Sequence, residues 1–188
     1  FTAKEMHCPL FVRVPRFHRV QGIVRSGMGK SRMSTPDGTA EAIEADALTV
    51  AATNLRSALE CKSLLQGFND AGMEPLFVKG LTLGALAYGN PAIKFAVDID
   101  LLIDDEQLER AADLLQQHGY RVEEPAGPYR PETPRAWHGP GKESTWVRPD
   151  PWSVVDLHTR LSDHPRLIPQ IGLESPRQMV EISKGIAL

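Results

Sequence analysis

The residues most able to do chemistry in this chain are two aspartates in an apolar stretch. Residues 95–103 read Phe-Ala-Val-Asp-Ile-Asp-Leu-Leu-Ile and contain no glycine or proline, which predicts a strand. Because side chains alternate between the faces of a strand, Asp98 and Asp100 share one face and the intervening apolar residues the other. An unpaired buried carboxylate is costly, so such a pair is normally matched by a cation. Carboxylate oxygens, together with substrate phosphates, suit Mg²⁺.

A possible anion site precedes these aspartates. Residues 76–78 are Leu-Phe-Val, which predicts a short strand, and a helix is expected over 81–88. A strand that leads through a glycine into a helix leaves backbone N–H groups at the positive end of the helix dipole. Gly80 and Leu81 would supply these N–H groups, and Lys79 would add a positive charge beside them. Many junctions of this kind bind no anion, so the prediction depends on what lies next to it.

A third carboxylate follows near the end of the chain. Residues 152–158 predict a strand that places Asp156 and His158 on one face. If this strand neighbours the Asp98–Asp100 strand, three carboxylates converge, and two metal ions about 3.5–4 Å apart would suit them. Two alternatives stay open from the sequence. Asp156 could pair with a base such as Arg160, and His158 could orient Asp156, contact substrate, or be an ordinary buried sheet histidine.

The remaining elements must position these groups. Helical spacing over residues 39–71 predicts one or two helices whose apolar stripe packs in the core. The stripe consists of Leu48, Ala52, Leu55, Leu59 and Phe68. Further predicted elements are a helix capped by Asp104 and closed by Gly119, strands at 120–124 and 143–147, and a helix from Ser175-Pro176 through Ile182. This order predicts an α/β (α+β) fold, with a small mixed β-sheet flanked by helices.

The composition predicts one main domain. The 188 residues carry a net charge of −3, which argues against a dedicated nucleic-acid binder. No apolar run is long enough for a membrane span, and two cysteines make no disulfide framework, so a cytoplasmic setting is expected. Residues 1–33 hold seven Lys and Arg against one Glu. We expect residues 1–38 to be a flexible basic arm, and 39–188 a single domain with a Pro-rich loop at 125–151.

Several short motifs occur together, in order. They are Val78-Lys79-Gly80-Leu81, Tyr88-Gly-Asn-Pro91, Lys94, Asp98-Ile-Asp-Leu-Leu102, His118-Gly-Tyr120 and Val155-Asp-Leu-His-Thr-Arg-Leu161. Over roughly residues 45–185 the chain resembles the uncharacterised-nucleotidyltransferase family of the DNA polymerase β-like nucleotidyltransferase superfamily. Asp-x-Asp alone is common, whereas the whole set in this order is specific. Lys94 stands where the family tends to have Arg, and Thr159 where Trp is common.

The resemblance implies a nucleotidyltransferase fold and site. It implies that Asp98 and Asp100 hold Mg²⁺, with Mn²⁺ as the alternative ion, and that Asp156 binds the catalytic metal or activates the acceptor. The nucleotide-binding residues expected from it are Lys79, Gly80, Leu81, Lys94 and His158. The activity it implies is transfer of an NMP from an NTP to an acceptor (a small molecule, a protein or RNA), with release of pyrophosphate.

Two other functions stay open from the sequence. The first is a catalytically weak nucleotidyltransferase-like module that binds nucleotide or a protein partner in a toxin–antitoxin or biosynthetic-cluster setting. The second is a metal-dependent phosphohydrolase that uses the same carboxylates. Metal binding and turnover separate these functions from nucleotidyl transfer.

Overall fold

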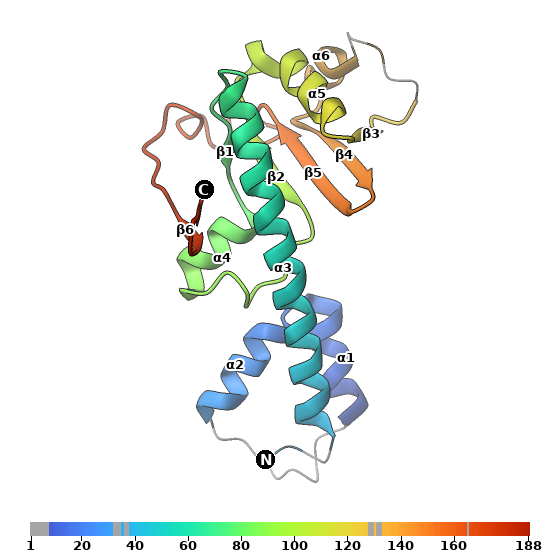
Figure 1. Cartoon of the computed structure of the whole chain (residues 1–188), viewed down its shortest axis with the longest axis vertical. Coiled ribbons are helices and arrows are strands. Elements are labelled where there is room, and N and C mark those ends of the chain that lie inside the picture. Colours follow the sequence, from blue (N-terminus) through green and yellow to red (C-terminus); the bar gives the residue numbers. More distant parts are fainter. Residues whose placement is uncertain (1–7, 32–34, 36–37, 128–129, 131–132, 165) are drawn as a thin grey trace.

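A mixed sheet lies at one end of the molecule and a helical hairpin at the other (Figure 1). The computed structural model describes residues 8–31, 35, 38–127, 130, 133–164 and 166–188. Its five-stranded sheet has the order β1–β2–β5–β4–β3, in which β2 and β5 are parallel and the other pairs antiparallel. The strands are β1 (Leu76–Phe77), β2 (Ile99–Leu102), β3 (Arg121–Glu124), β4 (Glu143–Pro149) and β5 (Trp152–His158). The mixed α/β fold predicted from the sequence is therefore confirmed.

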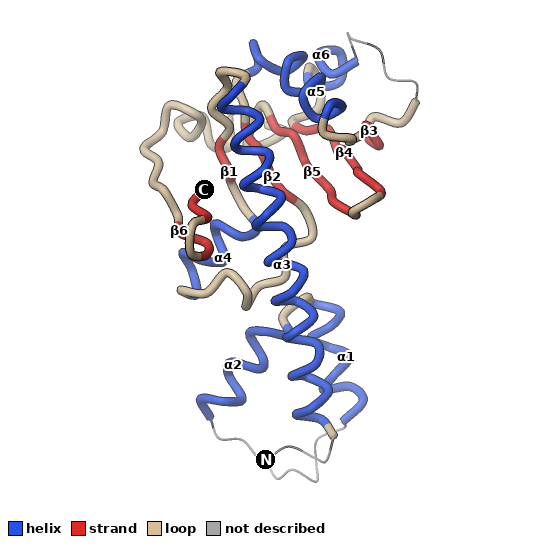
Figure 2. The backbone as a smooth tube through the Cα atoms, in the orientation of Figure 1, coloured by secondary structure: helices blue, strands red, loops and turns tan. Residues whose placement is uncertain are grey.

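Helices flank this sheet and form the hairpin at the other end of the molecule (Figure 2). They are α1 (Cys8–His18), α2 (Gln21–Ser31), α3 (Thr39–Asp70), α4 (Gly80–Tyr88), α5 (Leu108–Gln117) and α6 (Thr133–His138), with a 3₁₀ turn, η2 (Asp105–Gln107), before α5. Helix α3 runs the length of the molecule, and its first half carries α1 and α2 (Figure 1). Among the helices of the described residues, none has the length and apolar character needed to cross a membrane.

The core fills the space between α3, α5 and one face of the sheet. Leu101 and Leu157 come from the two central strands, Leu64 and Phe68 from α3 and Leu115 from α5, and each is 0% exposed. Burial of each such side chain contributes about 1.5–3 kcal/mol. The alternation predicted for both central strands is confirmed, because Ile99, Leu101, Val155 and Leu157 join this core, whereas Asp100, Asp156 and His158 lie on the opposite face.

The predicted core stripe of α3 was wrong in its first half. Leu48, Leu55 and Leu59 are more than half exposed, although Phe68 is buried as expected. The buried stripe instead consists of Ile43, Ala47, Val50, Asn54, Ala58, Cys61, Leu64 and Phe68. Both stripes have helical spacing, and only the packing of the hairpin and the sheet selects between them. The region predicted as one or two helices is a single helix of 32 residues.

The N-terminal segment is more ordered than an arm. Residues 1–38 were predicted to be flexible, whereas their described part is mostly the two helices α1 and α2, which contact α3. Arg16 Nε lies 2.7 Å from Asp46 Oδ2, and Arg25 Nε lies 2.5 Å from Glu44 Oε2. Two of the positive charges of this segment therefore pair with acidic residues of α3. The division of the chain into this segment and one following domain stays a prediction.

The C-terminal helix predicted from Ser175-Pro176 was also wrong. The structure has an extended segment there, which leads into a hairpin of β6 (Glu181–Ser183) and β7 (Ile186–Ala187). Val180, Ile182 and Ile186 are each less than 9% exposed and join the main core. The two-residue spacing of Val180 and Ile182 fits a strand, and it outweighs the local start signal. The segment 125–151, predicted as a Pro-rich loop, contains α6 and all of β4.

Candidate functional site

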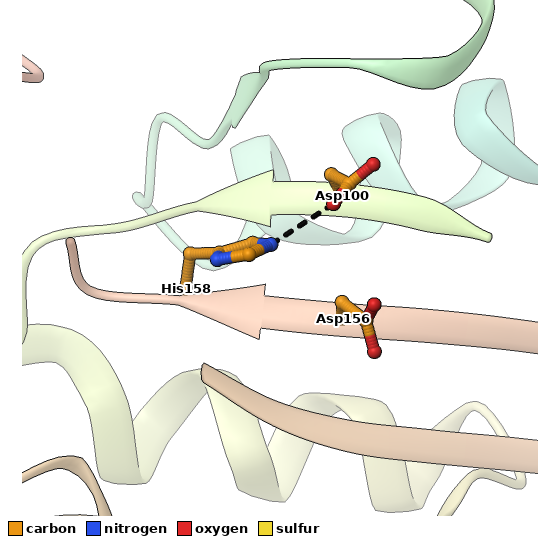
Figure 3. A group of neighbouring side chains, drawn as sticks. All are labelled: Asp100, Asp156 and His158. Carbon is orange, nitrogen blue, oxygen red and sulfur yellow. Dashed lines mark hydrogen bonds and ion pairs between the residues drawn. The ribbon is translucent and has the colours of Figure 1, made fainter. Parts of the chain in front are cut away.

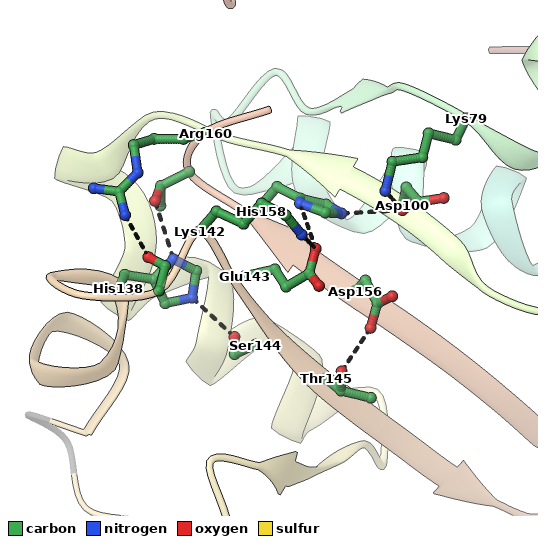
Figure 4. A network of polar contacts seen from close by, with 12 residues as sticks. Lys79, Asp100, His138, Lys142, Glu143, Ser144, Thr145, Asp156, His158 and Arg160 are labelled. Atoms are coloured by element: carbon green, nitrogen blue, oxygen red, sulfur yellow. Dashed lines mark hydrogen bonds and ion pairs between the residues drawn. The ribbon is translucent and has the colours of Figure 1, made fainter. Parts of the chain in front are cut away.

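The register of the central strands assembles the site. Strands β2 and β5 run parallel with Asp100 opposite Asp156, as expected if the two aspartate-bearing strands are neighbours. Strand β4 lies on the other side of β5 and places Thr145 opposite Asp156 and Glu143 opposite His158. Residues paired across strands point to the same face. All five side chains thus lie on the sheet face away from the core (Figure 3, Figure 4).

Asp100 is buried and held by two cationic or donor groups. Its Oδ1 accepts a hydrogen bond from Lys79 Nζ at 2.5 Å and lies 3.0 Å from His158 Nε2. Burial alone would raise the pKa of Asp100, but the contacts with His158 and Lys79 outweigh it and lower that pKa. The same contact with Asp100 raises the pKa of Lys79 against the opposing effect of burial. Asp100 is therefore a carboxylate at neutral pH.

His158 joins Asp100 to a carboxylate that the sequence analysis did not select. The imidazole is 1% exposed, and its Nδ1 lies 3.0 Å from Glu143 Oε2, at ion-pair distance but without the alignment of a hydrogen bond. Lys142 Nζ also contacts Glu143 Oε2. Contacts join five side chains in a row, which are Lys79, Asp100, His158, Glu143 and Lys142 (Figure 4). Glu143 could be found only from the register of β4 against β5.

Asp156, unlike Asp100, makes no ion pair with a described residue. Thr145 Oγ1 donates a hydrogen bond of 2.7 Å to its Oδ1. Burial raises the pKa of Asp156, and the charges of Asp98, Glu143 and Asp100 raise it further, which the Thr145 hydrogen bond opposes. Several negative groups therefore crowd around this position.

The alternative ion pair of Asp156 with Arg160 does not form. Arg160 Nη2 donates to Gly141 O at 2.7 Å and to Gly139 O at 3.4 Å. Among the described residues no cation lies within ion-pair distance of Asp156. The half-buried carboxylate thus has negatively charged neighbours and no paired cation, which is the environment that a bound divalent ion compensates.

The residues present fit a divalent metal ion. Asp100, Asp156 and His158 each offer one ligand atom, and these atoms lie within 4.8 Å of one another. Oδ2 of each aspartate accepts no hydrogen bond from any residue that the structure describes. The two carboxylates suit Mg²⁺ or Mn²⁺, whereas an imidazole ligand is more usual for later transition metals. Asp98, predicted as a ligand, precedes β2 by one residue and is half-buried.

The predicted phosphate-binding junction opens on a neighbouring pocket. A cavity of about 330 Å³, which we call the Gly80 pocket, is lined by Lys79, Gly80, Lys94, Asp98 and Asp100 and by residues of the α1–α2 turn. Gly80 has a φ of +47°, and a Cβ there would lie 3.4 Å from the carbonyl oxygen of Asp98. A glycine therefore allows the start of α4 to approach the aspartate segment closely.

Three predicted residues lie outside the lining of the Gly80 pocket. Leu81 is 5% exposed and belongs to the core, so it can offer only its backbone N–H. Asp156 and His158 lie on β5, one strand further from the pocket than β2. A larger cavity of about 950 Å³ is lined by none of the predicted site residues, and its walls come from α4 and the C-terminal segment. Of these two cavities, only the Gly80 pocket borders Asp98 and Asp100.

A buried asparagine of α3 fixes the segment that carries Lys94 and leads to Asp98. Asn54 Nδ2 donates hydrogen bonds of 2.7 Å to Pro91 O and to Lys94 O, and its Oδ1 accepts one of 3.1 Å from Ala96 N. Its side-chain amide thus takes the place of backbone pairing in an irregular segment. The sequence signal for this role is that Asn54 is a polar residue on an otherwise mostly apolar stripe of α3.

Comparison with known proteins adds a family assignment. Neither the curated proteins nor the solved structures contain a match to the chain. A family model described as uncharacterised nucleotidyltransferase matches residues 4–185. This match spans nearly the whole chain, including α1 and α2 as well as the sheet that carries Asp100 and Asp156. The chain therefore belongs to the uncharacterised nucleotidyltransferase family.

Proposed function

We propose that the protein is a divalent-metal-dependent nucleotidyltransferase that moves an NMP from an NTP to an acceptor hydroxyl and releases pyrophosphate. The observation that carries this proposal is the register of β2 against β5, which sets Asp100 beside Asp156 with His158 within reach of both. Family membership supports the same reaction class. The acceptor can be a small molecule, a protein or RNA.

The Gly80 pocket would receive the triphosphate. Lys79 and Lys94 line it and supply positive charge, while the N–H groups of Gly80 and Leu81 stand at the start of α4. These groups neutralise and position phosphate oxygens. They also stabilise the charge that builds up on pyrophosphate as it leaves.

The carboxylates would organise the reacting atoms. Asp98, Asp100 and Asp156 would hold Mg²⁺ or Mn²⁺, which supplies charge neutralisation of the phosphates and orientation of the attacking oxygen. His158 holds Asp100 in place through the contact of Nε2 with Oδ1. Thr145 does the same for Asp156.

In the proposed transfer, one bond at the α-phosphorus of the NTP replaces another. The acceptor oxygen forms a bond to the α-phosphorus, the bond from that phosphorus to the bridging oxygen of pyrophosphate breaks, and the acceptor proton moves to Asp156. A carboxylate beside the attacking oxygen can accept this proton as a general base.

A direct experiment is incubation of the protein with Mg²⁺ and each of the four α-labelled NTPs, with and without candidate acceptors. We expect pyrophosphate release and transfer of the label for at least one NTP. Asp156→Asn should abolish both, whereas Asp113→Asn, a change at an exposed site on α5, should leave both unchanged.

The alternatives predict other outcomes. Nucleotide binding without transfer by any NTP would favour the catalytically weak binding module. Release of inorganic phosphate in place of pyrophosphate would indicate a phosphohydrolase. Absence of both nucleotide binding and turnover would contradict the proposal.

A further inference from the structure

The turn between α1 and α2 forms part of the Gly80 pocket. His18, Arg19, Val20 and Ile23 line this cavity together with Lys79 and the aspartate segment. These residues are at least 56 positions from Lys79 in the sequence, so the contact is a product of the fold. The hairpin therefore supplies a wall to the proposed nucleotide site.

A close backbone contact holds this wall in place. Gly22, in the first turn of α2, is buried, and a Cβ at this position would lie 2.3 Å from the carbonyl oxygen of Ile93. The segment that carries Ile93 is itself held by the hydrogen bonds of Asn54 to Pro91 and Lys94. The α1–α2 turn is thus seated against the segment that leads to Asp98.

The arginines of the hairpin differ in their partners. Arg16 and Arg25 make ion pairs with Asp46 and Glu44 of α3. Arg19 lines the Gly80 pocket, and its side chain has no hydrogen-bond or ion-pair partner among the residues that the structure describes. The first two arginines fasten the hairpin to α3, whereas the charge of Arg19 is available to a ligand.

The backbone at Arg19 is also unusual. Its φ is +56°, and it is the one non-glycine residue with positive φ among the described part of the chain. It follows the last residue of α1, where Val20 N donates to Pro15 O, a position at which glycine is the usual residue. An arginine is strained here, and strain of this kind is often kept for the sake of a side chain.

We infer that Arg19 binds the phosphate chain of the nucleotide from across the Gly80 pocket, so that the α1–α2 hairpin completes the phosphate-binding site. Lys94 is the other lining cation without a side-chain partner among the described residues, while Lys79 is paired with Asp100. Two unpaired cations in one small cavity suit a polyanion. The identification of that polyanion as an NTP rests on the proposed function.

The test measures the Kd of inorganic tripolyphosphate and of the NTP, each with Mg²⁺, by calorimetry. We expect Arg19→Gln to weaken both about tenfold, the loss of one charge-assisted contact. Arg13→Gln is the matched control, because Arg13 is an exposed arginine of α1 that does not line the pocket, and its Kd values should equal those of the unchanged protein.

Two further variants, one that gains and one that loses a glycine, separate effects on phosphate binding from effects on folding. Arg19→Gly relieves the positive φ, so its Tm should not fall although phosphate binding weakens as in Arg19→Gln. Gly22→Ala should displace the hairpin and weaken binding without removing a charge. Gly27→Ala is its control on the same helix, since a Cβ there meets nothing within 4 Å.

The outcomes distinguish this inference from the proposed function. Binding of tripolyphosphate that weakens in Arg19→Gln supports the inference even where no transfer is found. Kd values unchanged in Arg19→Gln, in a protein that binds both ligands, overturn the inference and leave the proposed function intact. Absence of binding of either ligand to the unchanged protein overturns both.

Discussion

A histidine is buried on each face of the sheet near the end of β5, one between carboxylates and the other between hydroxyls (Figure 4). On the site face, His158 lies between the carboxylates of Asp100 and Glu143. On the other face, His138 of α6 lies between two hydroxyls, with Nε2 3.0 Å from Ser144 Oγ and Nδ1 3.0 Å from Thr159 Oγ1.

The difference separates a site from a structural network. Burial lowers the pKa of His138 to about 4, so this imidazole is neutral and its two hydroxyl partners satisfy it. The cluster around His158 instead concentrates charge, with Asp156 left in excess negative surroundings. A buried neutral network stabilises the fold, whereas a buried cluster of carboxylates indicates a bound cation. The following predictions test this contrast.

The largest effect is expected at Asp100. Asp100→Asn removes the charge that Lys79 and His158 both contact, and we expect the rate of nucleotidyl transfer to fall by about 10³-fold. Pyrophosphate release at saturating NTP measures this rate. Ser144→Ala, on the opposite face of β4, should keep at least half of the activity, and an equal loss in both variants would argue against a distinction between the faces.

His138 should make stability depend on pH. Its pKa is about 4 in the folded protein against 6.5 as a free side chain, so the unfolded state binds more protons between these values. The free energy of unfolding should therefore fall as pH drops from 6.5 to 4, by up to about 3 kcal/mol from this residue. Urea denaturation across this range measures it. His138→Gln should flatten the slope, and an unchanged slope would show that other groups cause it.

His158 should affect metal binding more than folding. His158→Gln removes the imidazole that holds Asp100, and a change of this kind costs about 10–100-fold in metal affinity. Titration with Mn²⁺, followed by electron paramagnetic resonance of the free ion, gives the affinity. His138→Gln should bind Mn²⁺ as the unchanged protein does, and equal losses in the two variants would remove the contrast between the histidines.

The smallest effect is expected at Thr145. Thr145→Val keeps the shape but removes the hydrogen bond to Asp156 Oδ1. One such bond contributes about 1 kcal/mol, so transfer should slow by about fivefold. The rate of pyrophosphate release measures the effect. A loss as large as that of Asp100→Asn would mean that Thr145 itself contacts the substrate.

Local patterns in the sequence predicted much of the sheet. The alternation over residues 152–158 gave β5 with its observed bounds, and the Asp100 stretch gave β2, although the strand is shorter than expected. The sequence predicted that Asp100 and Asp156 lie close together only if their strands are neighbours. The structure shows that β2 and β5 are neighbours. The assignment of Asp98 and Lys94 to metal and nucleotide stays a prediction.

Long-range packing explains what the sequence did not predict. Glu143 reaches His158 only because β4 pairs with β5 in one register. Proline usually breaks a helix, yet Pro15 lies buried inside α1, where packing of the hairpin against α3 outweighs one missing backbone hydrogen bond. The exposure of Leu48 and the pocket contact of Arg19 depend likewise on how distant elements dock.

We propose that the carboxylates of β2 and β5 form one metal site for nucleotidyl transfer. Its most direct test is an electron paramagnetic resonance titration with Mn²⁺, in the presence of NTP, of the unchanged protein and of a double variant, Asp100→Asn with Asp156→Asn. If Asp100 and Asp156 share a metal ion, the unchanged protein binds Mn²⁺ saturably and the folded double variant does not. Equal binding of Mn²⁺ by both proteins would contradict it.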